Sequence, residues 1–366
     1  MNRAIFILAV LVLPALLLAQ DKAAAPQDAV KSFPGPDFVL RDKDLKPPKR
    51  GVVLGPMESD GKGGTKGSFA IYGGSSLIQV GSLSLSGDGK VLAVGSTPGR
   101  VDLWDVDNRK KFRTLEGGTT VALSSDGRLL AKDGNGIELC DVATGKLEKR
   151  IPWVLKTSKP GVQNTIDSLV FNPAGTLLDV TANGEDDSVY EVSSGQLLAT
   201  LTNTQGAQFS RDGAFLIGGN AKHLIVWNTK HWSKASDLPN GPDYVTRIAA
   251  FPPKDLVVVG GPNAARLLRL SSGEELAKVG AGYTNFAAFN QSGTLIFTYT
   301  SSGFAVWDTS GKQYCSRPDI GNGTVALSAD DRWLAAAPVN GGTTVMIWNV
   351  QNALDVCGVP ASMQGR

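Results

Sequence analysis

Two short landmarks alternate along this chain, each seven times and always in the same order. The first is a turn sequence, often Asp-Gly, which follows a short strand-like segment and suits a two-residue hairpin turn. Its copies are Asp88-Gly89, Asp126-Gly127, Ala174-Gly175, Asp212-Gly213, Pro253-Lys254, Ser292-Gly293 and Asp330-Asp331. Counted from the first residue of each copy, the steps are 38, 48, 38, 41, 39 and 38 residues.

The second landmark, near the end of a later apolar strand, pairs a large or apolar residue with a polar one. Its copies are Trp104-Asp105, Cys140-Asp141, Tyr190-Glu191, Trp227-Asn228, Leu268-Arg269, Trp307-Asp308 and Trp348-Asn349. A period near 40 residues with four strands per unit is typical of a propeller blade. Each unit has two apolar faces, which it can bury by packing against neighbours around an axis. We therefore predict an all-β fold over residues 69–366: a seven-bladed β-propeller with four antiparallel strands per blade.

The pairs Trp104-Asp105 and Trp307-Asp308, together with the Ser-x-Asp-Gly turns, resemble WD repeats and the related bacterial propeller repeats. The resemblance covers about residues 80–357 and implies the fold, while this fold hosts many functions. The family pattern also carries a Gly-His pair before the first strand, and here the two histidines, His223 and His231, fall in one blade. At three of the seven positions where the repeat pattern has tryptophan, the chain carries another residue, namely Cys140, Tyr190 or Leu268. The chain thus resembles a degenerate WD-like propeller of a bacterial secreted type.

The N-terminus predicts export. Arg3 precedes an apolar run from Ile5 to Leu18, and Ala19 precedes polar residues, which is typical of a signal peptide over residues 1–20. The alternative is an uncleaved membrane anchor. Residues 21–68 hold six prolines and seven glycines, which predicts a flexible tether. We expect the mature protein to be periplasmic or secreted.

Ring closure and cysteine pairing each leave two alternatives. Residues 72–78 could return as a clasp that completes the last blade, or residues 354–359 could supply its fourth strand. Cys315 and Cys357 lie eight and nine residues after Trp307 and Trp348. Both would then lie on outer strands of neighbouring blades, either as a disulfide or as two free thiols. Cys140 is expected to be a buried small hydrophobe.

Charge and motifs argue against several functions. The 36 basic and 34 acidic residues give a net charge of +2 without a basic block, which argues against nucleic-acid binding through phosphate contacts. His-Glu-x-x-His, Gly-x-Ser-x-Gly and phosphate-loop motifs are missing from the sequence, so we predict no catalytic residues and no cofactor. The acidic turn Glu185, Asp186 and Asp187 is a weak candidate for Ca²⁺, the alternative being solvated carboxylates.

Candidate partner-binding residues gather in loops expected on one face. In a propeller, the loops that lead into first strands and those that join second to third strands share a face. We expect there Trp153, Lys156, Lys159, Tyr244, Arg247 and Tyr283. Aromatic residues and arginine are enriched in binding hot spots, although Trp153 and Tyr244 could instead anchor their loops.

These observations favour a monomeric, extracytoplasmic scaffold or adaptor that binds a protein partner, with membrane contact at most through an uncleaved anchor. The alternative is an exported enzyme or small-ligand binder, lactonase-like or quinone-dependent, with a site at the channel mouth. Such a site needs converging polar groups. The first strands instead carry mostly hydroxyl and amide residues, with Arg247 as the main charge; these are Ser82, Thr119, Thr120, Asn285 and Thr324.

Overall fold

The computed structural model describes residues 30–41, 79–153, 165–182, 186–220, 222–239, 245–318, 323–338 and 344–365. It also places the backbone of four short strands, which pair as β3 (Val53–Leu54) with β6 (Phe69–Ala70) and β4 (Glu58–Ser59) with β5 (Thr65–Lys66). The chain divides into two units, Met1–Val30 and Lys31–Arg366, and the ring described below belongs to the second.

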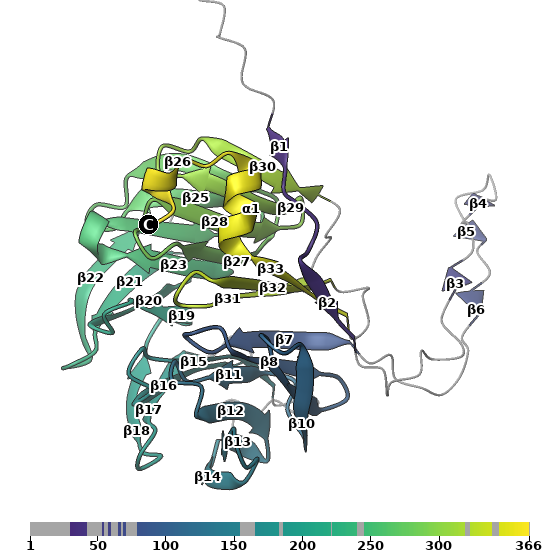
Figure 1. Ribbon diagram of the computed structural model, residues 1–366. Helices are drawn as coiled ribbons and strands as arrows, with labels where there is room; N and C mark the ends of the chain where they lie inside the picture. The colour runs from purple at the N-terminus through teal and green to yellow at the C-terminus, as the bar shows by residue number, and fades with distance from the viewer. Residues whose placement is uncertain are drawn as a thin grey trace, which may run out of the picture. The chain divides into compact units, whose positions relative to one another are not determined.

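The second unit is a seven-bladed β-propeller with four antiparallel strands per blade, which confirms the predicted fold class (Figure 1). Blade 1 consists of β7 (Val80–Leu85), β8 (Val91–Ser96), β9 (Arg100–Asp105) and β10 (Lys110–Glu116). Blade 2 consists of β11 (Val121–Leu123), β12 (Leu129–Gly134), β13 (Gly136–Asp141) and β14 (Leu147–Ile151). Blade 3 consists of β15 (Ile166–Phe171), β16 (Leu177–Ala182), β17 (Asp187–Glu191) and β18 (Leu197–Leu201). Blades 4 and 5 are β19 (Gln205–Phe209), β20 (Phe215–Gly219), β21 (His223–Asn228), β22 (Ser233–Pro239); and β23 (Arg247–Phe251), β24 (Leu256–Gly260), β25 (Ala264–Arg269), β26 (Glu275–Ala281).

The last two blades combine strands from both ends of this unit. Blade 6 is β27 (Thr284–Phe289), β28 (Leu295–Thr300), β29 (Gly303–Asp308) and β30 (Gln313–Arg317), with β1 (Lys31–Ser32) added parallel to β30. Blade 7 is β31 (Gly323–Leu327), β32 (Trp333–Pro338) and β33 (Val345–Asn349), with β2 (Phe38–Leu40) added antiparallel to β33. The N-terminal segment therefore supplies the fourth strand of blade 7.

This closure is the N-terminal clasp of the first predicted alternative, but residues other than those predicted form it. Residues 72–78 lie outside the described residues, and Leu354 belongs to helix α1 (Val350–Cys357) rather than to a strand. Residues 31–40, assigned from the sequence to the tether, instead belong to the ring because Phe33 and Leu40 are buried in it. Apart from Val30, Arg41 and the short strands, the rest of the predicted tether and the predicted signal peptide lie outside the described residues.

The recurrent first turn is held together by its own side chains. In blade 1, the Ser86 hydroxyl donates to Asp88 at 2.7 Å and accepts from the Val91 amide at 3.0 Å. The next residue, Gly89, has a φ of +67°, a conformation that glycine adopts without a Cβ penalty. The same serine–aspartate bond recurs at Ser124, Ser210 and Ser328, so the Ser-x-Asp-Gly landmark encodes a local hairpin turn.

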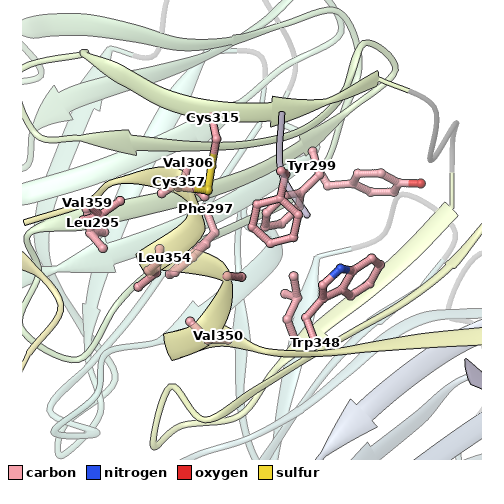
Figure 2. Close-up of a cluster of buried hydrophobic side chains, with 14 of the residues drawn as sticks. Leu295, Phe297, Tyr299, Val306, Cys315, Trp348, Val350, Leu354, Cys357 and Val359 are labelled. Carbon is pink, nitrogen blue, oxygen red and sulfur yellow. A yellow bond between two sulfur atoms is a disulfide. The ribbon is translucent and has the colours of Figure 1, made fainter. Parts of the chain in front are cut away.

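The C-terminal segment packs on blades 6 and 7 as helix α1 (Figure 2). Asn349 caps the helix by accepting from the Asn352 amide, and Gly358, with a φ of +75°, ends it. Leu354 and Val350 are buried in the cluster around Trp348 and Phe297. Among the described residues, no helix is long and apolar enough to cross a membrane.

A disulfide joins Cys315 to Cys357, with Cα atoms 5.5 Å apart. Cys315 lies on the outer strand β30, as expected, but Cys357 lies at the end of α1 and not on an outer strand. The chain after Asn349 turns into a helix because β2 already occupies the fourth-strand place of blade 7. Cys140 is a buried free thiol on β13, in contact with the apolar core.

Candidate functional site

The first strands of neighbouring blades contact one another around the central axis. We call the end of the ring at which these strands begin the loop face, and the end at which they turn into second strands the turn face. The loop face carries Thr119, Asp167, Arg247, Tyr283 and Asn285 among the described residues. All five belong to first strands or lie within two residues before them, so the fold brings blades 2, 3, 5 and 6 together at this mouth.

Arg247 is the main cation at this mouth. Its Nε donates to the backbone carbonyl of Asn285 on the next blade at 2.9 Å, and Nη1 donates to the carbonyl of Thr246 at 2.7 Å. The surrounding protein lowers the pKa of the Arg247 guanidinium through desolvation, whereas Tyr283 and Asp167 act to raise it. Neutral carbonyls thus position a partly desolvated guanidinium, while the residue as a whole remains exposed.

Tyr283 stands beside this cation on the turn that leads into blade 6. The Tyr283 amide donates a hydrogen bond to the Ser301 hydroxyl at 3.0 Å. The Tyr283 carbonyl accepts one from the Ser301 amide at 2.8 Å. The side chain itself is 43% exposed. A fixed backbone with an exposed aromatic ring next to an arginine is a combination enriched in binding hot spots.

The hydroxyl residues along the first strands mostly link blades to each other. The Ser82 hydroxyl donates to the Thr119 carbonyl at 2.7 Å and accepts from the Val121 amide at 2.9 Å. The Thr120 hydroxyl donates to the Ile166 carbonyl at 2.8 Å. These groups hold blades 1, 2 and 3 in register, so their hydrogen-bonding capacity serves the ring.

The other predicted binding residues divide into two groups. Trp153 is half-buried and packs against the core between blades 2 and 3, which is the loop-anchor arrangement. Lys156, Lys159 and Tyr244 lie outside the described residues, so their role stays a prediction.

The acidic turn of blade 3 separates in the structure. Asp186 is exposed and accepts from the Asn203 amide at 2.7 Å, whereas Asp187 is buried at the start of β17. Glu185 lies outside the described residues. Within the described part of the chain, no three acidic, histidine or cysteine side chains gather as a metal site would require. The geometry therefore adds nothing to the weak Ca²⁺ prediction.

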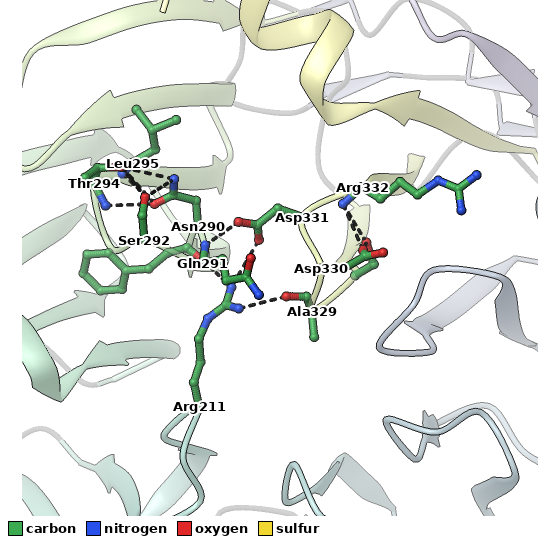
Figure 3. Close-up of polar contacts among 12 residues, drawn as sticks. Arg211, Asn290, Gln291, Ser292, Thr294, Leu295, Ala329, Asp330, Asp331 and Arg332 are labelled. Atoms are coloured by element: carbon green, nitrogen blue, oxygen red, sulfur yellow. Dashed lines mark hydrogen bonds and ion pairs between the residues drawn. The ribbon is translucent and has the colours of Figure 1, made fainter. Parts of the chain in front are cut away.

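Sequence reasoning missed Arg211, which crosses the turn face (Figure 3). From blade 4, its guanidinium donates to the carbonyls of Ala329 at 2.8 Å and Phe289 at 3.1 Å, and it pairs with Asp331 at 3.2 Å. Asp331 in turn accepts from the Gln291 amide. One side chain thus ties blades 4, 6 and 7 together. A signal did exist, because the second turn residue is uncharged in the other six blades: Gly87, Ser125, Pro173, Pro252, Gln291 and Ala329.

Replacing Arg211 by alanine is expected to lower the free energy of unfolding by about 1–3 kcal/mol, because Asp331 and two carbonyls lose their donor. Burial already raises the pKa of the Asp331 carboxyl, and Arg211 opposes that rise. Urea unfolding measures the loss. Arg128→Ala, in the equivalent turn of blade 2 and exposed, is the matched control, and an equal effect of both variants would contradict the bridge.

Comparison with known proteins gives one similarity of note. No family model matches the chain. The Periodic tryptophan protein 2 homolog of Schizosaccharomyces pombe is 24% identical over 185 residues, which cover 40% of this chain and 22% of that protein. The chain therefore matches less than a quarter of this relative's length. This WD-repeat similarity agrees with the propeller fold, and together they support a general role in protein–protein interaction.

Proposed function

We propose that this chain is an extracytoplasmic interaction module that holds a protein partner on its loop face, with Arg247 and Tyr283 at the centre of the contact. The observation that carries the proposal is the exposed residue Arg247, whose guanidinium is positioned by two carbonyls and interacts electrostatically with the exposed Tyr283. The bridge made by Arg211 occupies the opposite end of the ring. The loop face thus offers exposed groups suited to a hot spot at the end of the ring away from that bridge.

Two features support a location outside the cytoplasm. The N-terminal run from Ile5 to Leu18 is typical of a signal peptide. The Cys315–Cys357 disulfide is a bond that persists in oxidising compartments and is rare in the cytosol. Fractionation of the native host, with sequencing of the mature N-terminus, tests this part. A chain recovered in the cytoplasm with Met1 intact and reduced cysteines would contradict it.

Arg247→Ala and Tyr283→Ala are each expected to weaken partner binding about tenfold or more, the loss typical of a hot-spot residue. The partner is first captured by crosslinking the full chain in native extracts and identified by mass spectrometry. Its affinity for each purified variant is then measured by titration calorimetry.

The matched control for Arg247→Ala is Arg128→Ala, an exposed arginine on the turn face. We expect the control to bind like the natural chain. Equal affinity of all three variants would exclude the loop face as the binding surface, even if a partner is found.

A further inference from the structure

Blade 3 differs from the other six blades at two interior positions. Strand pairing aligns Asp179 of β16, opposite Val189, with residues that are apolar in every other blade: Ala93, Ala131, Ile217, Val258, Phe297 and Ala335. Asp187, three residues before the aromatic position, aligns with Val101, Ile137, Leu224, Ala265, Phe304 and Val345. Blade 3 thus carries two carboxyls where the other blades carry apolar core.

The two carboxyls lie on one face of blade 3, the face that meets blade 4. Asp179 pairs with Val189, and Asp187 lies two residues before Val189 on the same strand, so both aspartates point to the same face. Val180 and Ser188 pair on the opposite face. Both aspartates are fully buried, at 0% exposure. One oxygen of Asp187 accepts from the Ala207 amide of blade 4 at 3.0 Å. Its other oxygen and both oxygens of Asp179 are buried without a hydrogen-bond partner, while the Thr181 hydroxyl and the Gly206 amide also favour the charged form of Asp187.

Among the described residues of the adjacent strands β15, β18, β19 and β20, no lysine or arginine compensates these carboxyls, and β15 adds a further acid, Asp167. Asp186 precedes the pair, Glu191 ends β17, and His223 at the start of β21 is paired with Asp237 at 2.7 Å. Two ionised carboxylates cannot share such a site without large cost, so one must keep a proton.

We propose that Asp179 and Asp187 share a proton and form a pH-sensitive latch between blades 3 and 4. A proton on Asp179 gives its hydroxyl an acceptor in the unpartnered oxygen of Asp187, which the Ala207 amide already favours as the charged member. Release of that proton to solvent leaves two carboxylates in an apolar interface. The repulsion then loosens the contact between the blades.

The latch is connected to the loop face. The Asp187 amide donates to the Thr204 carbonyl at 2.9 Å, and the Thr204 hydroxyl accepts from the Trp227 indole at 2.8 Å. The neighbouring Asp186 holds the Asn203 amide. Movement of β17 away from blade 4 therefore acts directly on residues 202–204, which lead into blade 4.

The direction of the pH effect follows from proton uptake. Burial raises the pKa of Asp187 from its usual 3.8 to about 7, and burial beside Asp187 raises the pKa of Asp179 well above its usual range. At acidic pH the folded chain therefore holds a proton on each carboxyl, and as the pH rises toward 7 Asp187 ionises first and leaves the remaining proton on Asp179, whereas the unfolded chain releases both above about pH 4. The stabilisation from these protons is full below about pH 4. As the pH rises above that value, the unfolding constant increases about tenfold per pH unit for each proton that the folded chain still retains, until the pH passes the pKa of that carboxyl.

The test compares the full chain with a variant that copies blades 1 and 7, Asp179→Ala with Asp187→Val. Urea unfolding is measured from about pH 5 to about pH 8. We expect the unfolding constant of the natural chain to rise about a hundredfold more than that of the variant over this range, the effect of one proton retained over the two pH units between about 5 and 7. Asp331, whose pKa burial also raises, is present in both chains and cancels. Parallel stability curves for the two chains would overturn the proposal.

A second measurement does not depend on the folding of that variant. Infrared spectra of the natural chain in heavy water should show a protonated carboxyl band near neutral pH, which disappears as the pH is raised. Asp179→Asn should remove this band, because its amide donates permanently to Asp187. A natural chain without any protonated carboxyl at neutral pH would overturn the latch.

Discussion

Replacing Phe33 by alanine is expected to lower the free energy of unfolding by about 3–5 kcal/mol, the usual cost of truncating a buried phenylalanine. Phe33 follows β1 and is 2% exposed. Its ring lies 4.7 Å from that of Phe304 and 5.9 Å from that of Trp348, between centroids. The substitution therefore opens a cavity at the point where the N-terminal segment enters blades 6 and 7.

The loss should also weaken the closure of the ring. The adjacent Pro34 carbonyl accepts from Arg317 at 2.7 Å and from the Trp348 indole at 3.0 Å, bonds that depend on the position of Phe33. Urea unfolding followed by circular dichroism measures the stability, and limited proteolysis after residue 40 reports release of the segment. Phe112→Ala makes the same chemical change at a side chain that is 41% exposed and should cost little. Equal costs for both variants would show that the segment is not part of the core.

The architecture was predictable because it is encoded locally and repeated. Each blade carries its own turn chemistry, as at Ser86 and Asp88, and its own apolar positions, as at Trp104. Seven copies of a local signal in register determine the number of blades. The fourth strand of blade 7 was not predictable in this way. Phe38–Leu40 is three residues long, has no landmark, and pairs with Val345–Ile347, more than 300 residues away.

The candidate site was predictable in part for the same reason. Arg247 and Tyr283 were named from the sequence because their residue types and loop positions are local properties, and their role in binding stays a prediction. The cross-ring contact of Arg211 with Asp331 depends on where blade 4 faces blade 7, which spacing along the chain does not give. Asp179 was detectable by aligning the blades, but its sharing of an interface with Asp187 depends on strand register.

Removing the disulfide is expected to cost about 4 kcal/mol of unfolding free energy. The bond closes a loop with a sequence separation of 42 residues, and the chain-entropy relation gives this magnitude for a loop of that length. Cys315 and Cys357 are both buried in the cluster that α1 shares with blade 6, so Cys315→Ala with Cys357→Ala keeps the site apolar.

The measurement is urea unfolding of the natural chain and the double variant, each with and without dithiothreitol. Reductant should lower the stability of the natural chain to about that of the double variant and leave the variant unchanged. Cys140→Ala, at the buried free thiol, controls for loss of a cysteine side chain and should stay sensitive to reductant. If the natural chain keeps its full stability after mass spectrometry shows the bond reduced, then packing of α1 alone secures the C-terminus.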